Sequence, residues 1–386
     1  MMKHRISASE AEKLYAARVF EVELLDELTG RIAVSCRQSV SRVMGRWQLE
    51  VDGKRDSFGQ FLLNGMVPGE RREFLLSVEV PDLHYGERAV LIIRFYDENN
   101  VELAAESFLL PPPAYFPETP AKEQFFTGVR FDVSQAIISS GKLSAVIDAN
   151  GMRELLYNGE KRSLSGPRIS LWRSQMVPEK LKELELDRIR ISADRFVSDG
   201  KSVESHALVL PKKMEMDELE FTQKFTPQED GSIRYDAEFV VPECFADIPR
   251  LGVMLRLPGD MKKVTFLGKG PFENYAGGKA GIFSEYTFPA GEMYPELKEA
   301  LSAGNRSGVR RVRLESEDQR MVEIFAGNEM NITVLPFSEY AIDDAAKAGK
   351  MPENEGDIYL YIDCRIGEKQ PVRAGFSRMS LFFRAR

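Results

Sequence analysis

Residues 267–279 read LGKGPFENYAGGK, and this stretch sets an acid, an amide and a phenol side by side at Glu273, Asn274 and Tyr275. It is too polar and too rich in glycine for a strand interior, so we expect a loop that leaves the strand KKVTFLG. Such a group could serve a sugar, a metal ion, a phosphate or only the fold. We predict mainly a role in folding, because glycines permit tight turns, Pro271 has a fixed φ, and the Glu and Asn side chains can hydrogen-bond the backbone of the turn. A role near a bound sugar is the second possibility.

A second stretch with chemical potential is DIYLYIDCRI, at 357–366. Strand alternation places one set on a core face, comprising Ile358, Leu360, Ile362 and Cys364. The opposite face then carries Tyr359, Tyr361, Asp363 and Arg365. Two aromatic rings beside charged groups form a surface on which a sugar ring can stack, while the competing interpretation is cross-strand tyrosine pairing on a solvated sheet.

Other reaction chemistries find little support in the residue types. The three histidines, His4, His84 and His206, lack metal-ligand spacing, and we expect His206 to be an ordinary strand residue. Cys36, Cys244 and Cys364 lack paired spacing, which favours reduced, buried thiols. No helix pattern follows the glycine-rich loop, so a phosphate site is not expected. Among 60 acidic residues no glycosidase pair can be chosen. We therefore assign no catalytic residue, metal or cofactor.

Composition narrows the class of protein. The chain has 386 residues, 43% of them hydrophobic and 29% charged, as in ordinary globular domains. A net charge of −8 argues against a nucleic-acid partner. No apolar run approaches the roughly 20 residues of a membrane span, and the first residues lack a secretory signal. The expected location is the cytoplasm.

Short runs with period-two alternation, separated by Gly, Asp or Asn, predict an all-β protein. Residues 1–110 are expected to form an antiparallel sandwich. A stiff linker is predicted over 111–124, where five prolines occur within ten residues, and a second, larger β-domain is predicted over 125–386. Two segments could be helical, 179–191 and 338–348.

Several of these motifs occur in the order found in one enzyme family. FLGKGPFENYAGGKAGIF followed by SAGNRSGVRRV resembles the C-terminal β-domain of glycoside hydrolase family two β-galactosidases. The matching positions are Gly268, Gly270, Pro271, Glu273, Asn274, Tyr275, Lys279, Ala280, Gly304, Asn305, Arg306, Val309 and Arg310. The likeness extends through LWR at 171–173, NITVLPFS and IYLYID, and covers most of residues 15–386.

The resemblance implies a galactose-mutarotase-like supersandwich for the second domain and an immunoglobulin-like sandwich for the first. It also implies that the catalytic glutamates belong to a (β/α)₈ barrel, for which this chain has no strand–helix alternation. In the family, the β-domain lends an aromatic side chain to the sugar site. Here the matching position is Tyr359, with Tyr361 near it. Glu273, Asn274 and Arg306 are the further substrate-binding residues that the resemblance implies.

The chain departs from the family pattern where the family's loops approach the sugar. The departures lie at 174–182, Ala276–Gly278, Leu301–Ala303, Lys347 and 367–376. The interpretations that remain are a non-catalytic small chain that acts with a barrel-bearing partner, and a stand-alone carbohydrate-binding or structural β-protein. An aldose epimerase is disfavoured, because its acid–base set typically uses several histidines. Whether the chain is a separate subunit or part of a longer enzyme, and whether it self-associates, stays open.

Overall fold

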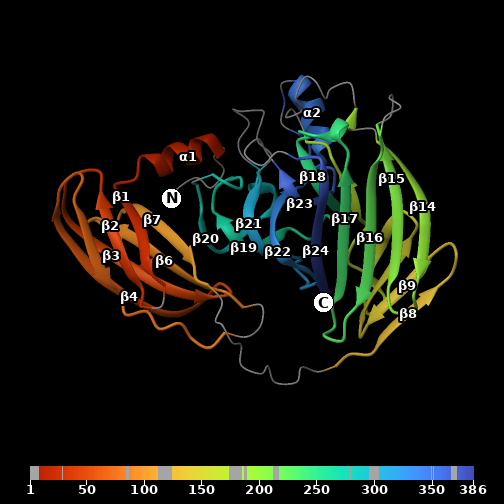
Figure 1. Ribbon diagram of the computed structural model, residues 1–386, viewed down its shortest axis with the longest axis horizontal. Helices are drawn as coiled ribbons and strands as arrows, with labels where there is room; N and C mark the ends of the chain where they lie inside the picture. The colour runs from red at the N-terminus through yellow and green to blue at the C-terminus, as the bar shows by residue number, and fades with distance from the viewer. Residues whose placement is uncertain are drawn as a thin grey trace.

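The computed structural model describes residues 8–27, 29–83, 87–111, 124–173, 185–186, 189–211, 217–278, 280–294, 304–348, 350, 352–366 and 372–386. Within them, strands dominate, and the helices are α1 (Ala8–Ala16), α2 (Glu339–Lys347) and the short 3-10 turns Glu243–Phe245 and Ala290–Glu292. The predicted fold class is confirmed: the chain is all β, a smaller sandwich followed by a larger assembly of sheets (Figure 1).

The smaller sandwich has two antiparallel sheets. A three-stranded sheet has the order β1-β2-β5, and a four-stranded sheet has the order β4-β3-β6-β7. The strands are β1 (Phe20–Asp26), β2 (Arg31–Cys36), β3 (Val40–Val51), β4 (Lys54–Met66), β5 (Arg71–Leu75), β6 (Ala89–Tyr96) and β7 (Glu102–Leu109). Alternating residues such as Ile32, Val34 and Leu49 point inward, and all three are fully buried in the core between the sheets.

The strand β6 reads AVLIIRFY and is apolar on both faces for a structural reason. Leu91 and Ile93 join the core of the smaller sandwich, whereas Val90 and Ile92 pack on the opposite side against Phe283 and its neighbours in the larger assembly. A strand covered on both faces loses the polar alternation of a half-exposed strand. The two parts of the molecule are therefore joined by an apolar contact through the sheet of β6.

The larger assembly contains a five-stranded sheet of order β12-β11-β10-β9-β8 and a twelve-stranded sheet. The strands of the first are β8 (Thr127–Phe131), β9 (Ala136–Ser140), β10 (Leu143–Asp148), β11 (Gly151–Tyr157) and β12 (Glu160–Lys161). Those of the second are β13 (Ser165–Ser170), β14 (Arg190–Ser198), β15 (Val203–Leu210), β16 (Leu219–Pro227), β17 (Ile233–Val241), β18 (Arg250–Pro258), β19 (Lys263–Gly270), β20 (Ile282–Pro289), β21 (Arg306–Glu315), β22 (Met321–Leu335), β23 (Asp357–Ile366) and β24 (Gly375–Ala385).

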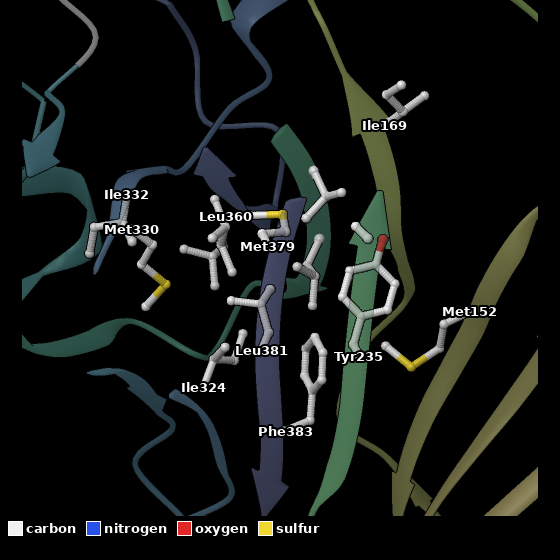
Figure 2. Packing of buried hydrophobic residues seen from close by; sticks show 14 of the residues in the cluster. Met152, Ile169, Tyr235, Ile324, Met330, Ile332, Leu360, Met379, Leu381 and Phe383 are labelled. Carbon is white, nitrogen blue, oxygen red and sulfur yellow. The ribbon is translucent and has the colours of Figure 1, made fainter. Parts of the chain in front are cut away.

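In the twelve-stranded sheet the main path runs β13-β18-β23-β22-β24-β17-β16-β15-β14, and β21, β19 and β20 branch from β22. Its inward residues form one continuous apolar core with β9–β11. Figure 2 shows Leu381 and Phe383 of β24 beside Ile324 of β22 and Tyr235 of β17. The buried Tyr235 hydroxyl donates to Gln223 Oε1 at 3.1 Å, so its polar group is satisfied.

The helix expectations have mixed outcomes. The helix predicted over 338–348 is confirmed as α2. The helix predicted over 179–191 is wrong at its end, because Arg190 and Ile191 open strand β14, and residues 179–184, 187 and 188 lie outside the described residues. No helix was predicted within residues 1–110, whereas α1 is present there. Residues 112–123 of the predicted linker lie outside the described residues, and the domain boundaries stay a prediction.

Candidate functional site

The GPFENY loop follows β19 and is held by the side chain of Asn274. Asn274 Nδ2 donates to the carbonyl oxygens of Lys269 and Phe272, at 2.9 and 2.8 Å. Its Oδ1 accepts from the backbone N–H of Ser307 at 3.0 Å and from the Ser307 hydroxyl at 2.5 Å. One amide thus ties the loop to itself and to the start of β21. The predicted folding role of this loop is confirmed.

Glu273 is 1% exposed and lies in the same loop. Tyr275 donates its hydroxyl to Glu273 Oε1 at 2.6 Å, and the backbone N–H of Gly304 donates to the same oxygen at 3.2 Å. The Arg173 guanidinium donates to the Tyr275 hydroxyl and lies over its ring, 4.6 Å from the centroid. Burial raises the pKa of Tyr275 well above its usual value, so this phenol stays a neutral donor.

Gly304 must be a glycine for two reasons. Its φ is +77°, and a Cβ there would lie 2.3 Å from the carbonyl oxygen of Met293. This backbone conformation aims the Gly304 N–H at Glu273. The Gly-Asn-Arg motif therefore begins with the residue that completes the hydrogen bonding of the neighbouring loop.

Arg250, the first residue of β18, is fully buried and joins three elements. Its Nη1 donates to Glu339 Oε1 at 2.6 Å, at the start of α2. Its Nε lies 2.9 Å from Asp363 Oδ1 on β23, although the two are not aligned for a hydrogen bond. The guanidinium also lies 4.4 Å from the ring centroid of Tyr361, whose hydroxyl accepts from the backbone N–H of Glu339 at 3.1 Å. The start of α2 is thereby fixed against β23.

These contacts form one group of buried charges, which we call the ionic cluster. It contains three cations and three anions, each at most 2% exposed: Arg173, Arg250, Arg306, Glu273, Glu339 and Asp363. Arg250 Nη1 lies 3.4 Å from the carbonyl oxygen of Trp172, beside Arg173. Arg250 contacts two of the acids, with Nη1 2.6 Å from Glu339 Oε1 and Nε 2.9 Å from Asp363 Oδ1, and buried charges of this kind need such oppositely charged neighbours.

Burial sets the ionisation of two members. It raises the pKa of Asp363 to about 7, and the nearby Arg250 opposes this only in part. Oδ1 of Asp363 faces Arg250 Nε at 2.9 Å, whereas Oδ2 has no hydrogen-bond partner among the described residues, which agrees with that direction. Burial also lowers the pKa of Arg306 to about 10. Arg306 donates to the carbonyl oxygens of Gly304 and Asn305, at 2.8 and 3.2 Å.

The second face of β23 differs from the predicted surface. Tyr361 is 4% exposed and Asp363 is fully buried, because α2 and β18 cover them. The prediction of an accessible face is therefore wrong for these two residues. Tyr359 lies two residues before Tyr361 and is only partly buried. Desolvation, helped by a hydrogen bond to Glu355, raises its pKa to about 12.

The five predicted substrate-binding residues thus fall into two groups. Glu273, Asn274, Arg306 and Tyr361 lie in the interior, and Tyr359 lies at its rim. Their binding of a substrate stays a prediction. Of the departures from the family pattern, 174–182, 301–303 and 367–371 lie outside the described residues, as does the side chain of Lys347.

Sequence reasoning missed Arg250 and Glu339 as members of this site. Each stands at the first position of its element, where a polar residue is ordinary, so neither residue type nor spacing marks it. Asp363 gave a signal, since an acid in the middle of an apolar strand needs a partner. The expected ordinary role of His206 is confirmed, because its Nδ1 lies 2.5 Å from Asp194 Oδ1 on the neighbouring strand.

The residues that the structure describes show neither a metal-binding cluster nor a membrane-spanning helix. No group of three or more His, Cys, Asp or Glu side chains among them is arranged to hold a metal ion. None of their helices combines the length and apolar character needed to cross a membrane. Cys36 is buried as predicted, but Cys244 and Cys364 are partly exposed, and all three are free thiols.

Comparison with known proteins gives several matches. A β-galactosidase of Priestia megaterium (strain DSM 319 / IMG 1521) is 22% identical over 280 residues, which are 70% of this chain and 26% of the relative. The chain therefore spans about a quarter of that relative's length. Among solved structures, a putative aldose 1-epimerase from Escherichia coli K12 is 9% identical, with a TM-score of 0.35 over 68% of this chain and 99% of that one. Galactose 1-epimerase from Lactobacillus acidophilus NCFM is 7% identical, with a TM-score of 0.32 over the same shares.

A family model matches the larger assembly of sheets. Residues 129–367 match the model described as the beta galactosidase small chain. The match begins in β8 and extends just past the end of β23, so it contains every member of the ionic cluster. With more than half of its length matched, the chain belongs to the beta galactosidase small chain family.

Proposed function

We propose that the chain is the non-catalytic part of a β-galactosidase-like glycoside hydrolase. It assists the binding and hydrolysis of terminal β-galactosides together with a chain or domain that carries a (β/α)₈ catalytic barrel. Membership of the small chain family supports this, as does a β-galactosidase relative of which the chain matches only a part. The observation that carries the proposal is the ionic cluster, in which Arg250 joins Glu339 of α2 to Asp363 of β23, the strand that also carries the partly buried Tyr359.

The cluster acts on Tyr359 by positioning it. Arg250 bridges Glu339 of α2 and Asp363 of β23, and the Tyr361 hydroxyl accepts from the N–H of Glu339. These contacts hold α2 against the face of β23 on which Tyr359 also lies. A ring held in this way loses little conformational entropy when it stacks on a sugar, which is the advantage of a pre-organised contact.

Glu273 and Arg306 contribute indirectly in this proposal. Both are buried: Glu273 accepts from the backbone N–H of Gly304, and Arg306 donates to the Gly304 carbonyl oxygen. They hold the GPFENY loop and the start of β21 beside Arg173 and thereby shape the end of the sheet that would face the barrel. The sugar contact is assigned to Tyr359, and the buried residues are positioning residues.

A reconstitution experiment tests the proposal. The P. megaterium β-galactosidase is truncated so that it lacks the region that this chain matches, and the full chain is supplied separately. Native mass spectrometry measures the complex, and hydrolysis of an aryl β-galactoside measures activity. We expect a complex and restored hydrolysis, as obtained when the relative's own missing region is supplied as a positive control. Restoration by that control but not by this chain would overturn the proposal.

The role of Tyr359 has its own test in the reconstituted enzyme. Tyr359→Ala is expected to raise KM by roughly three- to tenfold, the loss of one aromatic contact of about 0.5–1.5 kcal/mol, with the complex intact. Tyr340→Ala is the matched control, because Tyr340 lies on α2 and is 48% exposed. Equal KM values for both variants and the unmodified chain would remove Tyr359 from the sugar site. Sugar binding by the isolated chain in calorimetry, lost in Tyr359→Ala, would instead favour a stand-alone carbohydrate-binding protein.

A further inference from the structure

The strand β4 forms one edge of the four-stranded sheet. It is 13 residues long and pairs with β3 from Val40↔Met66 to Val51↔Lys54. Among the described residues, no other strand pairs with it, and Figure 1 shows it along the lower rim of the smaller sandwich. A long edge strand presents a row of backbone donors and acceptors to any extended chain that meets it.

The outward face of β4 exposes two large apolar side chains. Phe58 is 69% exposed and Leu62 is 50% exposed, and the two lie on the same face because they are four residues apart. In the neighbouring strand, Gln48 pairs with Phe58 and Met44 pairs with Leu62. These residues form a patch that reaches the open edge of the sheet.

The patch continues an interface that is already formed. Gln48 also pairs with Ile92 of β6, so Phe58, Gln48 and Ile92 form one cross-strand row. Ile92 is fully buried against Phe283 of the larger assembly. One half of this sheet face is therefore covered within the chain, and the half that ends at Phe58 and Leu62 is open. Exposed apolar residues of this kind commonly mark an interaction surface.

The backbone of β4 shows which residues offer hydrogen bonds at the edge. Arg72 Nη1 donates to the carbonyl oxygen of Asn64 at 2.8 Å, so this carbonyl points away from β3. Residues of a strand alternate in direction, and the pairing with β3 is regular from Ser57 to Asn64. The N–H and C=O groups of Phe58, Gln60 and Leu62 therefore point toward the open edge.

We propose that this edge pairs with the same edge of a second copy of the chain, antiparallel and about a two-fold axis at Gln60. Gln60 then faces Gln60 of the second copy, and Phe58 faces its Leu62. The pairing extends over residues 58–62 only, because a β-bulge between Arg55 and Ser57 interrupts the regular strand there, and no charged side chain lies within that stretch. The two four-stranded sheets become one continuous sheet of eight strands. The contact is isologous, as in most homodimers.

Neighbouring registers fit less well. A shift of two residues toward the N-terminus places Leu62 opposite the β-bulge at Asp56, where the strand is irregular and the side chain is an acid. The opposite shift places Phe58 opposite Asn64, whose carbonyl oxygen already accepts from Arg72. The register centred on Gln60 uses the three outward residues and leaves the Arg72 contact intact.

Sedimentation equilibrium on the full chain tests the pairing. We expect a dimer at about 100 µM, and Leu62→Lys is expected to raise the dimer dissociation constant at least about tenfold, because it places a charge in the apolar contact. Leu75→Lys is the matched control, since Leu75 of β5 is 64% exposed in the other sheet, and its dissociation constant should be unchanged. A monomeric wild type at that concentration, or a dimer as stable in Leu62→Lys as in wild type, overturns the proposal.

Disulfide trapping tests the register. Directly opposed residues in an antiparallel hydrogen-bonded pair have Cα atoms about 5.5 Å apart, within the range that a disulfide spans. Gln60→Cys should therefore yield a covalent dimer on mild oxidation. Lys54→Cys is the control, because the two substituted residues of the dimer would lie on opposite sides of the two-fold axis. At about 3.4 Å per residue, their Cα atoms would be roughly 40 Å apart. The same oxidation of the unmodified chain gives the background of covalent dimer formed through Cys244 and Cys364. Equal trapping at both positions, or none at Gln60, contradicts the two-fold axis at Gln60.

Discussion

At the scale of single residues, the Arg250 side chain joins separate parts of the chain: it contacts Glu339 of α2, Asp363 of β23 and the carbonyl oxygen of Trp172. A fully buried guanidinium is tolerated only with compensating anions, and Glu339 and Asp363 supply them. Removing the cation leaves two buried carboxylates without their partner. The cost is therefore expected to exceed that of a surface ion pair by several kcal/mol.

Arg250→Met should lower the free energy of unfolding by about 3–5 kcal/mol. Urea denaturation followed by tryptophan fluorescence measures it. Arg256→Met is the matched control on the same strand, since Arg256 pairs with Asp357 at the surface, with Nε 2.6 Å from Oδ2. Its effect should be within about 1 kcal/mol. Similar losses in the two variants would contradict the buried role of Arg250.

The sequence could predict one face of β23 but not the fate of the other. Ile358, Leu360 and Ile362 are buried as their alternation indicates. Tyr361 and Asp363 look equally suited to solvent, and their burial is explained by α2, which follows β22 in the chain, and by Arg250 of β18. Alternation reports which residues share a face, and what covers that face depends on contacts distant in sequence.

At the scale of elements, α1 is the helix that sequence reasoning missed. Its nine residues present a narrow apolar stripe, so the period of a helix is weak. Ala11 is fully buried against Phe272 and Ala280, and the ring of Tyr15 meets that of Phe272 edge to face, with centroids 6.3 Å apart. The helix thus packs on the GPFENY loop, and its stability comes from tertiary contact rather than from intrinsic propensity.

Ala11→Glu should release α1 from this loop, because it puts a charge at a fully buried position beside Phe272 and Ala280. Amide hydrogen exchange of residues 8–16 is expected to accelerate by at least roughly tenfold, while exchange in β17 stays unchanged. Lys13→Glu changes an exposed position of the same helix and serves as the control. Unaltered exchange in Ala11→Glu would show that the packing contributes little.

In the larger assembly, the positions of the strands in the sequence were easier to predict than which strands pair with each other. The GPFENY loop and the strand before it occur where the turn residues and alternation indicate. The branch of β19, β20 and β21 from β22 could not be read from the sequence, because strand pairing depends on long-range contacts. The same limit applies to the ionic cluster, whose members come from six separate parts of the chain.

At the scale of the whole molecule, burial of tyrosines links stability to alkaline pH. Burial raises the pKa of eight tyrosines, namely Tyr15, Tyr96, Tyr235, Tyr275, Tyr286, Tyr294, Tyr359 and Tyr361. For Tyr294 the value reaches about 12. Above pH of about 10 the unfolded chain releases these protons while the folded chain retains them, so the free energy of unfolding must fall as pH rises.

The urea midpoint is expected to be steady from pH 8 to about 9.5 and to fall between about pH 10 and 12, by up to about 1.4 kcal/mol per pH unit for each fully buried tyrosine. Tyr235→Phe should reduce this slope. Arg306 has the opposite effect on the free energy of unfolding, because its pKa in the folded chain is lowered to about 10. The effect of this single group is outweighed by that of the several buried tyrosines. Absorbance at 295 nm provides the check, because tyrosines that ionise near pH 10 in the folded chain would refute the expectation.

The position of β24 has a consequence for how the protein is made. This strand lies between β17 and β22, in the interior of the sheet, yet its residues 375–385 follow those of every other strand described. On the ribosome, the twelve-stranded sheet cannot close until β24 has left the exit tunnel. Until then, a nascent chain displays two long apolar strand edges, and it is at this stage that chaperones would protect it most.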